Sequence, residues 1–148
     1  MDIPTKIKIQ LCIERGSVFN FFIDFDSPKR QPKNRYFIVL NRNPKTDTAL
    51  LMVTSTTQTQ KRREFVKRAG ISEKTIVEVK AGEYSAFTRD SSFNCDEIFE
   101  VKIDDLVRKI EENGSMHYPK FPDNILRRII NGVNESPEVT QSIKNLIK

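Results

Sequence analysis

Three short apolar runs constrain the fold most, because the segments between them are too short to hold a helix. Residues 18–25 alternate between apolar and polar side chains, whereas residues 36–40 and 49–53 are unbroken apolar runs. Alternation with a period of two is typical of a half-buried strand, and short unbroken runs are typical of strands covered on both faces. The connections, residues 26–34 and 41–47, are polar and rich in turn-forming side chains. Parallel neighbours need a crossover of about a dozen residues or more, so we predict antiparallel strands.

The remaining chain changes from short strands to helices at residue 103. Weaker strand patterns cover residues 75–80, 84–87, 92–95 and 98–101. Apolar residues then recur at helical spacing from Ile103 to the Asn113-Gly114 stop, again from Pro122, and again after Ser136, which could cap a third helix. Two segments stay ambiguous: residues 5–13 fit a strand or a helix, and residues 61–68 fit a helical turn or an irregular arm. Strands followed by helices predict an α+β fold with a small, strongly bent antiparallel sheet or barrel.

We expect the chain to divide near residue 114, with a barrel-like domain over residues 1–113. Residues 114–148 would form a helical C-terminal extension packed on or beside it. The whole chain has 148 residues, the size of one ordinary domain, and 2 cysteines that stand 83 positions apart. It has no apolar run of membrane-spanning length and no signal-peptide pattern at Met1. These features favour a cytoplasmic protein without a zinc site, a disulfide framework or a membrane span.

Charge is divided unevenly along the chain. Residues 1–70 contain 14 Lys and Arg against 6 Asp and Glu, whereas residues 71–148 contain 11 against 14. A basic half suggests a surface that meets phosphates, although lysines and arginines also simply keep a surface solvated. The single histidine, His117, stands in a polar segment and is a weak candidate for a catalytic base.

The best candidate for chemistry is an arginine and two hydroxyl residues at predicted strand ends. Arg35 begins the second apolar strand, and Thr54 and Ser55 end the third. If these strands are antiparallel neighbours, the start of one lies beside the end of the other. A guanidinium presents a rigid fork of donors that matches two phosphate oxygens, and a hydroxyl adds another donor. The alternative is that Arg35 pairs with a surface carboxylate and the hydroxyls only end a strand.

The order of these motifs resembles the PemK/MazF family of toxin endoribonucleases. The resemblance rests on Gly16-Ser17-Val18-Phe19, on residues 33–41 with Arg35 before an apolar strand, and on residues 51–55, an apolar strand that closes in Thr-Ser. Residues 98–110 are similar to the last strand and terminal helix of the family. Tyr36 stands where the family usually has Pro, and the loop before it lacks the usual Glu and glycines.

The resemblance implies an SH3-like β-barrel, commonly a homodimer, that cuts single-stranded RNA without a metal or other cofactor. It implies that Arg35 and Thr54 are the catalytic residues, with Ser55 beside them in a less defined role. RNA brings its own nucleophile, the 2′-hydroxyl, so such a site mainly holds the phosphate and stabilises its charge. Basic and aromatic side chains could bind the flanking RNA: Lys29, Arg30, Lys33, Tyr36, Lys61, Arg62 and Arg63. The expected partners are RNA and an acidic antitoxin.

Two other functions remain open from the sequence. A non-catalytic module on the same barrel would bind nucleic acid with steep salt dependence and leave it intact. A protein-interaction module would use the apolar helices of residues 114–148 to dock a partner. Cleavage of RNA, or its absence, separates the first hypothesis from both alternatives.

Overall fold

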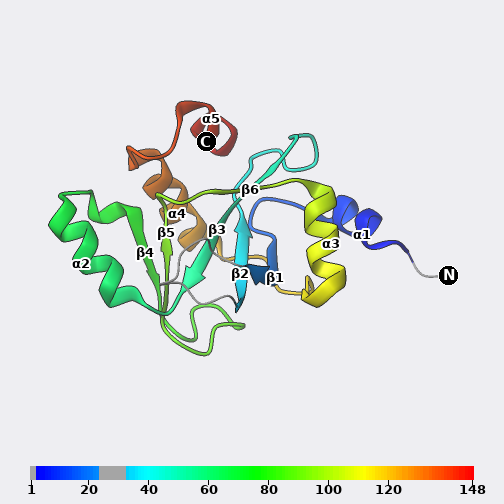
Figure 1. Cartoon of the computed structure of the whole chain (residues 1–148), viewed down its shortest axis with the longest axis horizontal. Coiled ribbons are helices and arrows are strands. Elements are labelled where there is room, and N and C mark those ends of the chain that lie inside the picture. The colour runs from blue at the N-terminus through cyan, green and yellow to red at the C-terminus, as the bar shows by residue number, and fades with distance from the viewer. Residues whose placement is uncertain (1–2, 24–32) are drawn as a thin grey trace.

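The computed structural model describes residues 3–23 and 33–148 as a bent antiparallel sheet with helices on both of its faces (Figure 1). The strands are β1 (Val18–Ile23), β2 (Lys33–Val39), β3 (Leu50–Thr56), β4 (Ile76–Val79), β5 (Ser91–Asn94) and β6 (Phe99–Val101). The helices are α1 (Thr5–Cys12), α2 (Thr59–Ala69), the short 3₁₀-helix η1 (Glu73–Thr75), α3 (Ile103–Asn113), α4 (Asp123–Glu135) and α5 (Gln141–Ile147). The predicted α+β class is therefore confirmed.

The sheet is built around β3, which pairs with three other strands. The order is β1-β2-β3-β5-β4. Strand β6 pairs with the first half of β3, on the same edge of β3 where β5 pairs with its last residues. Every one of these strand pairs is antiparallel, as predicted for the first three. Within the described residues no pairing joins β1 to β4, so the strands do not close into a barrel.

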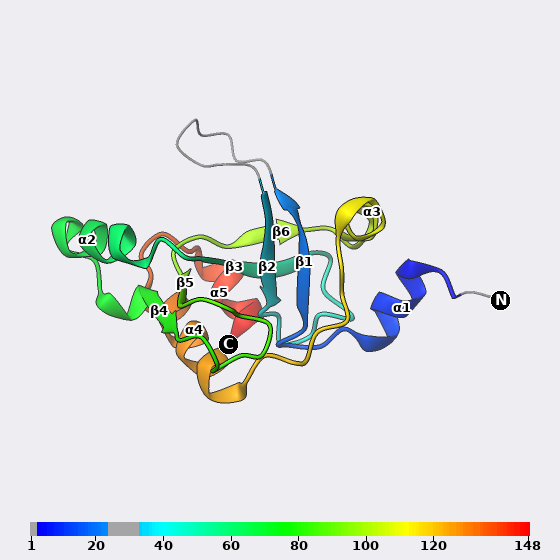
Figure 2. The ribbon, with the colours of Figure 1, turned by 90° about the horizontal axis from the view of Figure 1, so that it is seen from below.

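Strand β2 is covered on both faces, which explains its unbroken apolar sequence. Phe37 and Val39 belong to a core formed with α1 and α3, and the ring of Phe37 stacks on Phe21 of β1 at 4.0 Å. Ile38 belongs to a second core, on the opposite face, formed with α4 and α5. Figure 2 shows α1 and α3 on one side of β1 and β2, with α4 and α5 toward the other. Successive side chains of β2 point to opposite faces of the sheet and therefore pack in two different cores.

The ambiguous segments both form helices. Helix α1 buries Ile9, and the residue that ends it, Ile13, is also buried, whereas Ile7 and Leu11 are exposed. This spacing of four is helical. Helix α2 ends because Gly70 adopts a left-handed conformation with φ of +68°.

Two local predictions were wrong. Residues 84–87 form no strand: Tyr84 makes an isolated bridge to Ala81, residues 85–86 are a turn, and Tyr84 and Phe87 pack into an aromatic cluster with Phe121. The last helix begins at Gln141 rather than after Ser136, and its cap is Thr140. The Ser136 hydroxyl instead donates to Asp96 at 2.5 Å.

Helix α4 contributes to the same core as the central strands. Ile125, Ile129 and Val133 are buried in one cluster with Ile38 and Val53. The helix lies very close to η1 and to the residue after β5 at Gly132, where a Cβ would lie 2.4 Å from the Lys74 carbonyl oxygen and 2.7 Å from Cys95 Sγ. Because glycine has no side chain, α4 can pack this tightly at Gly132. In the part of the chain that the structure describes, no helix is long and apolar enough to cross a membrane.

We expect Gly132→Ala to lower the free energy of unfolding by about 2 kcal/mol, because the added methyl group overpacks a contact with rigid backbone. This expected loss is a net value, in which the overpacking outweighs the gain of about 1 kcal/mol in helix propensity that Ala brings to a helix interior. Asn131→Ala, at the exposed neighbouring position, is the control and should be neutral or slightly stabilising. Denaturant unfolding of both variants checks the prediction, and equal stability of Gly132→Ala and the parent protein would contradict it.

Candidate functional site

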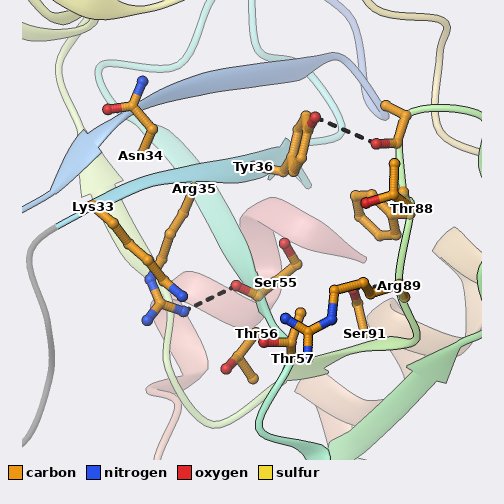
Figure 3. A pocket seen from close by; sticks show the side chains of 12 residues that line it. Lys33, Asn34, Arg35, Tyr36, Ser55, Thr56, Thr57, Thr88, Arg89 and Ser91 are labelled. Carbon is orange, nitrogen blue, oxygen red and sulfur yellow. Dashed lines mark hydrogen bonds between the residues drawn. The ribbon is translucent and has the colours of Figure 1, made fainter.

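A pocket of about 250 Å³ lies where β2 begins and β3 ends, and the segment before β5 closes its far side (Figure 3). Its lining comes from three separate parts of the chain: Lys33, Asn34, Arg35 and Tyr36; Ser55, Thr56 and Thr57; and Ala86, Phe87, Thr88, Arg89 and Ser91. The antiparallel pairing of β2 with β3 brings the first two groups together. The sequence predicted that Arg35 would lie beside Thr54 or Ser55, and of these two residues Ser55 lines the pocket with Arg35.

Arg35 is held in place by the neighbouring strand. Its Nη1 donates a hydrogen bond to the Ser55 carbonyl oxygen at 3.1 Å, and its side chain is half-buried. Figure 3 shows the guanidinium reaching from β2 across to β3, on the side of the pocket where Lys33 also extends. A guanidinium has five N–H donors in a fixed fork, and the bond to the Ser55 carbonyl oxygen orients that fork.

The pocket is strongly basic. Lys33, Arg35 and Arg89 line it, and none of the described lining residues is Asp or Glu. Arg89 was not among the sequence candidates, because residues 84–90 were interpreted as a strand and a turn. The signal that could have identified Arg89 is its position just before β5, because β5 pairs with the end of β3, where the pocket lies. Three cations among the described lining residues favour binding of an anion.

Hydroxyl groups complete the lining, but Thr54 is not among them. Ser55 and Thr56 line the pocket, whereas the Thr54 hydroxyl donates to the Tyr36 carbonyl oxygen at 2.9 Å. Thr56 Oγ1 accepts a hydrogen bond from the Gln58 N–H at 3.2 Å and keeps its hydrogen for donation. Because β2 and β3 pair with Phe37 opposite Thr54, the same register places Thr56 opposite Arg35. Thr56 is thus a residue that sequence reasoning missed, because it could not fix the register.

Tyr36 forms an aromatic wall of the pocket. Its ring lies 5.2 Å from the ring of Phe87 and 5.3 Å, edge-on, from that of Tyr118, and its hydroxyl donates to the Ala86 carbonyl oxygen at 3.4 Å. Burial, with Tyr118 as a smaller cause, raises the pKa of the Tyr36 phenol above its ordinary value. Burial also raises the pKa of Tyr84, behind this wall, to about 12. Both phenols therefore stay protonated donors at neutral pH.

The other predicted RNA-binding residues do not line the pocket. On α2, Lys61 is exposed, but Arg62 donates to Asp96 at 2.5 Å and to Asn94 at 2.9 Å. Arg63 forms an ion pair with Glu78 on β4. These pairs attach α2 to the sheet, so a contact of Arg62 or Arg63 with RNA would compete with them. Lys29 and Arg30 lie outside the described residues.

The remaining titratable side chains do not gather into a second centre. Among residues 3–23 and 33–148, no group of three or more His, Cys, Asp or Glu could hold a metal ion. Cys95 is buried, which raises the pKa of its thiol to about 12, and Cys12 is exposed. His117 is exposed on the segment before α4.

Comparison with known proteins supports the fold. No family model matches the chain, and neither does any curated protein sequence. Among solved structures, the chain is similar to one in the MazE-MazF (Form-III) crystal structure from Deinococcus radiodurans, with a TM-score of 0.55 and 9% identity over 86% of this chain and 98% of that chain. The Form-II crystal gives a TM-score of 0.52 and 9% identity over 82% and 92% of the two chains. The resemblance in fold to the MazF toxins is therefore confirmed.

Proposed function

We propose that the protein is a metal-independent endoribonuclease that cleaves single-stranded RNA and acts as the toxin of a toxin-antitoxin pair. The observation that supports this most is the Arg35 guanidinium, oriented by the Ser55 carbonyl in a pocket with Lys33 and Arg89. The MazF-like fold adds support at the level of architecture.

In the proposed reaction the ribose 2′-oxygen forms a bond to the adjacent phosphorus, and the bond from phosphorus to the 5′-oxygen breaks. The 2′-hydroxyl loses a proton, the 5′-oxygen gains one, and the products are a 2′,3′-cyclic phosphate and a 5′-hydroxyl. Negative charge grows on the non-bridging oxygens during this step, and Arg35 would stabilise it as a donor that is already oriented. Ser55 and Thr56 supply neutral donors at the same pocket. The chemistry needs no group that activates an external nucleophile, because RNA contains its own.

The proposed protein partner is an acidic antitoxin that covers the pocket. Lys33, Arg35 and Arg89 give the pocket a charge that an acidic segment would match. The structural neighbours are complexes whose names pair MazE with MazF, which is consistent with such a partner. A homodimer and a cytoplasmic location follow from the same family resemblance and form part of the proposal.

A second candidate function, binding of nucleic acid without cleavage, is favoured by one observation. The hydroxyl of Thr54, the residue that the family resemblance assigns to catalysis, is bonded to a backbone carbonyl rather than lining the pocket. Such a module would bind RNA through the same cations and leave it intact. Product analysis separates the two functions, since binding alone leaves the RNA length unchanged.

We expect Arg35→Ala to reduce cleavage of a mixed-sequence single-stranded RNA by roughly a hundredfold or more, because it removes the oriented donor for the phosphoryl oxygens. Arg35→Lys keeps the charge but loses the fork, so it should restore only part of the rate. The assay measures initial rates in the presence of chelator. Arg108→Ala, which removes an exposed arginine from α3, is the charge-matched control and should leave the rate unchanged. A full rate in Arg35→Ala would rule out the proposed site.

Thr56→Val should slow cleavage by about tenfold, whereas Thr54→Val should slow it less and instead reduce stability by about 1 kcal/mol. Thr56 faces the pocket opposite Arg35, and Thr54 holds the Tyr36 carbonyl of β2. Valine keeps the branched shape in both variants, so the hydroxyl alone is tested. Initial rates and denaturant unfolding of the two variants decide this. The reverse order of rates would assign the catalytic hydroxyl to Thr54.

A further inference from the structure

The two end strands of the sheet differ in how their outer edges are covered. Strand β1 forms one end of the order β1-β2-β3-β5-β4, and Asn20 on its outer edge exchanges two backbone hydrogen bonds with Ser115, at 2.9 and 2.8 Å. The Lys109 ammonium donates to the Phe22 carbonyl oxygen on the same edge at 3.3 Å. Strand β4 forms the other end of the sheet, on the side away from α1 and α3 (Figure 1). The outer edge of β4 has no such cover in the part of the chain that the structure describes.

The pairing of β4 with β5 shows which backbone groups of β4 point outward. Just before β4, the Thr75 carbonyl oxygen accepts a hydrogen bond from the Cys95 N–H at 2.8 Å, and the register places these two residues opposite each other. Opposite pairs in antiparallel strands alternate between hydrogen-bonded and non-hydrogen-bonded pairs. The backbone groups of Val77 and Val79 therefore bond to β5, whereas those of Glu78 point away from it.

Three backbone groups on the outer edge of β4 have no partner among the described residues. Ile76 also lies on this edge, and its N–H donates to the Glu73 carbonyl oxygen. The Ile76 carbonyl oxygen and both backbone groups of Glu78 make no hydrogen bond with residues 3–23 or 33–148. Unpaired N–H and carbonyl groups along an edge strand are a template for pairing with another extended chain.

A cavity of about 530 Å³ lies along this open edge. Its lining includes both Ile76 and Val77, which point to opposite faces of the sheet, so the cavity reaches around the edge of β4. The rest of the lining comes from η1 and α4: Glu73 and Lys74; Arg128, Asn131, Asn134 and Glu135. The two asparagine amides can each donate and accept hydrogen bonds. A segment that lies along β4 would therefore have polar side chains of α4 beside it.

We propose that the outer edge of β4, with the adjoining face of α4, binds an extended segment of a partner protein as an added strand. The unpartnered groups of Ile76 and Glu78 match the main-chain donors and acceptors of an extended peptide. The side chains that enter the cavity would carry no net charge, because its two acidic and two basic lining residues balance and Lys74 lies 4.0 Å from Glu135. This site shares no lining residue with the pocket that contains Arg35, and the inference does not depend on the proposed function.

The same observations argue against two other occupants of the edge. Proteins bind single-stranded nucleic acid in positively charged grooves, whereas the described lining of this cavity has equal numbers of acidic and basic residues. Glu78 is the one described residue of this edge with both its N–H and its carbonyl oxygen unpartnered. Antiparallel pairing with a second copy of the chain would therefore place Glu78 opposite Glu78, and like charges directly opposite each other destabilise a sheet.

Hydrogen exchange in the full chain tests the open edge without any ligand. The Glu78 amide should exchange roughly a hundredfold faster or more than the amides of Val77 and Val79, because those two bond to β5. Asn20 is the matched control on the covered edge, and its N–H, which bonds to Ser115, should exchange slowly. Equal protection of Glu78 and Val77 would mean that the chain covers this edge itself and would overturn the proposal.

Binding is tested with a phage-displayed library of short random peptides, selected on the full chain. A selected peptide, made synthetically, should bind Glu78→Ala like the parent protein and bind Glu78→Pro about tenfold more weakly, because proline removes the N–H. Both variants lose the carboxylate that pairs with Arg63, so the N–H is what separates them. An edge strand tolerates proline where the lost N–H points away from the sheet, and denaturant unfolding checks that both variants fold.

Methylation of the peptide's backbone nitrogens, one at a time, should weaken binding at every second position, and this pattern decides the matter if Glu78→Pro does not fold. The proposal is overturned if no peptide is selected, if the selected peptides bind both Glu78 variants equally, or if methylation shows no alternation. Protection of the Glu78 amide by a single-stranded oligonucleotide would instead assign the edge to nucleic acid. Protection that appears only as the protein concentration rises would assign it to a second copy.

Discussion

The pairing of β2 with β3 is the constraint on which the rest of the structure depends. Phe37 of β2 belongs to the core under α1 and α3, and Ile38 to the core under α4 and α5. A shift of the pairing by one residue would reverse the direction of every side chain and remove both cores from their partners. The same register puts Arg35 beside the end of β3. The apolar part of the two strands thus fixes the geometry of the polar pocket at their ends.

Contacts within the chain hold the residues of the pocket in place. Arg35 is oriented by a backbone carbonyl, and Tyr36 is held by Phe87 and Tyr118 from two other parts of the chain. Donors that are already oriented cost little reorganisation when charge develops on a bound phosphate. The segment that supplies Tyr118 follows α3, so the C-terminal part of the chain supports the wall of the site as well as the second core. The contacts that stabilise the fold therefore also hold the residues of the proposed reaction in place.

Much of the central sheet could be predicted from the sequence, because period-two alternation and unbroken apolar runs report directly on burial. The approach of Arg35 to Ser55 followed from strand order alone. The register could not be predicted, since it depends on the length of turns and on packing, so the sequence did not indicate that Thr56 lines the pocket. The partners of Arg62 and Arg63 are also set by tertiary structure: Asp96 and Glu78 lie 34 and 15 positions away. Arg89 was missed because aromatic packing of residues 84–87 replaced the expected strand.

The most direct test of the central claim is the chemistry of the RNA ends that the full chain produces in the presence of chelator. The fragments should carry a 2′,3′-cyclic phosphate on one side of each cut and a 5′-hydroxyl on the other, because the nucleophile comes from the RNA and the charge is stabilised by Arg35. Intact RNA, or fragments with a 5′-phosphate that require an external water nucleophile, would contradict it.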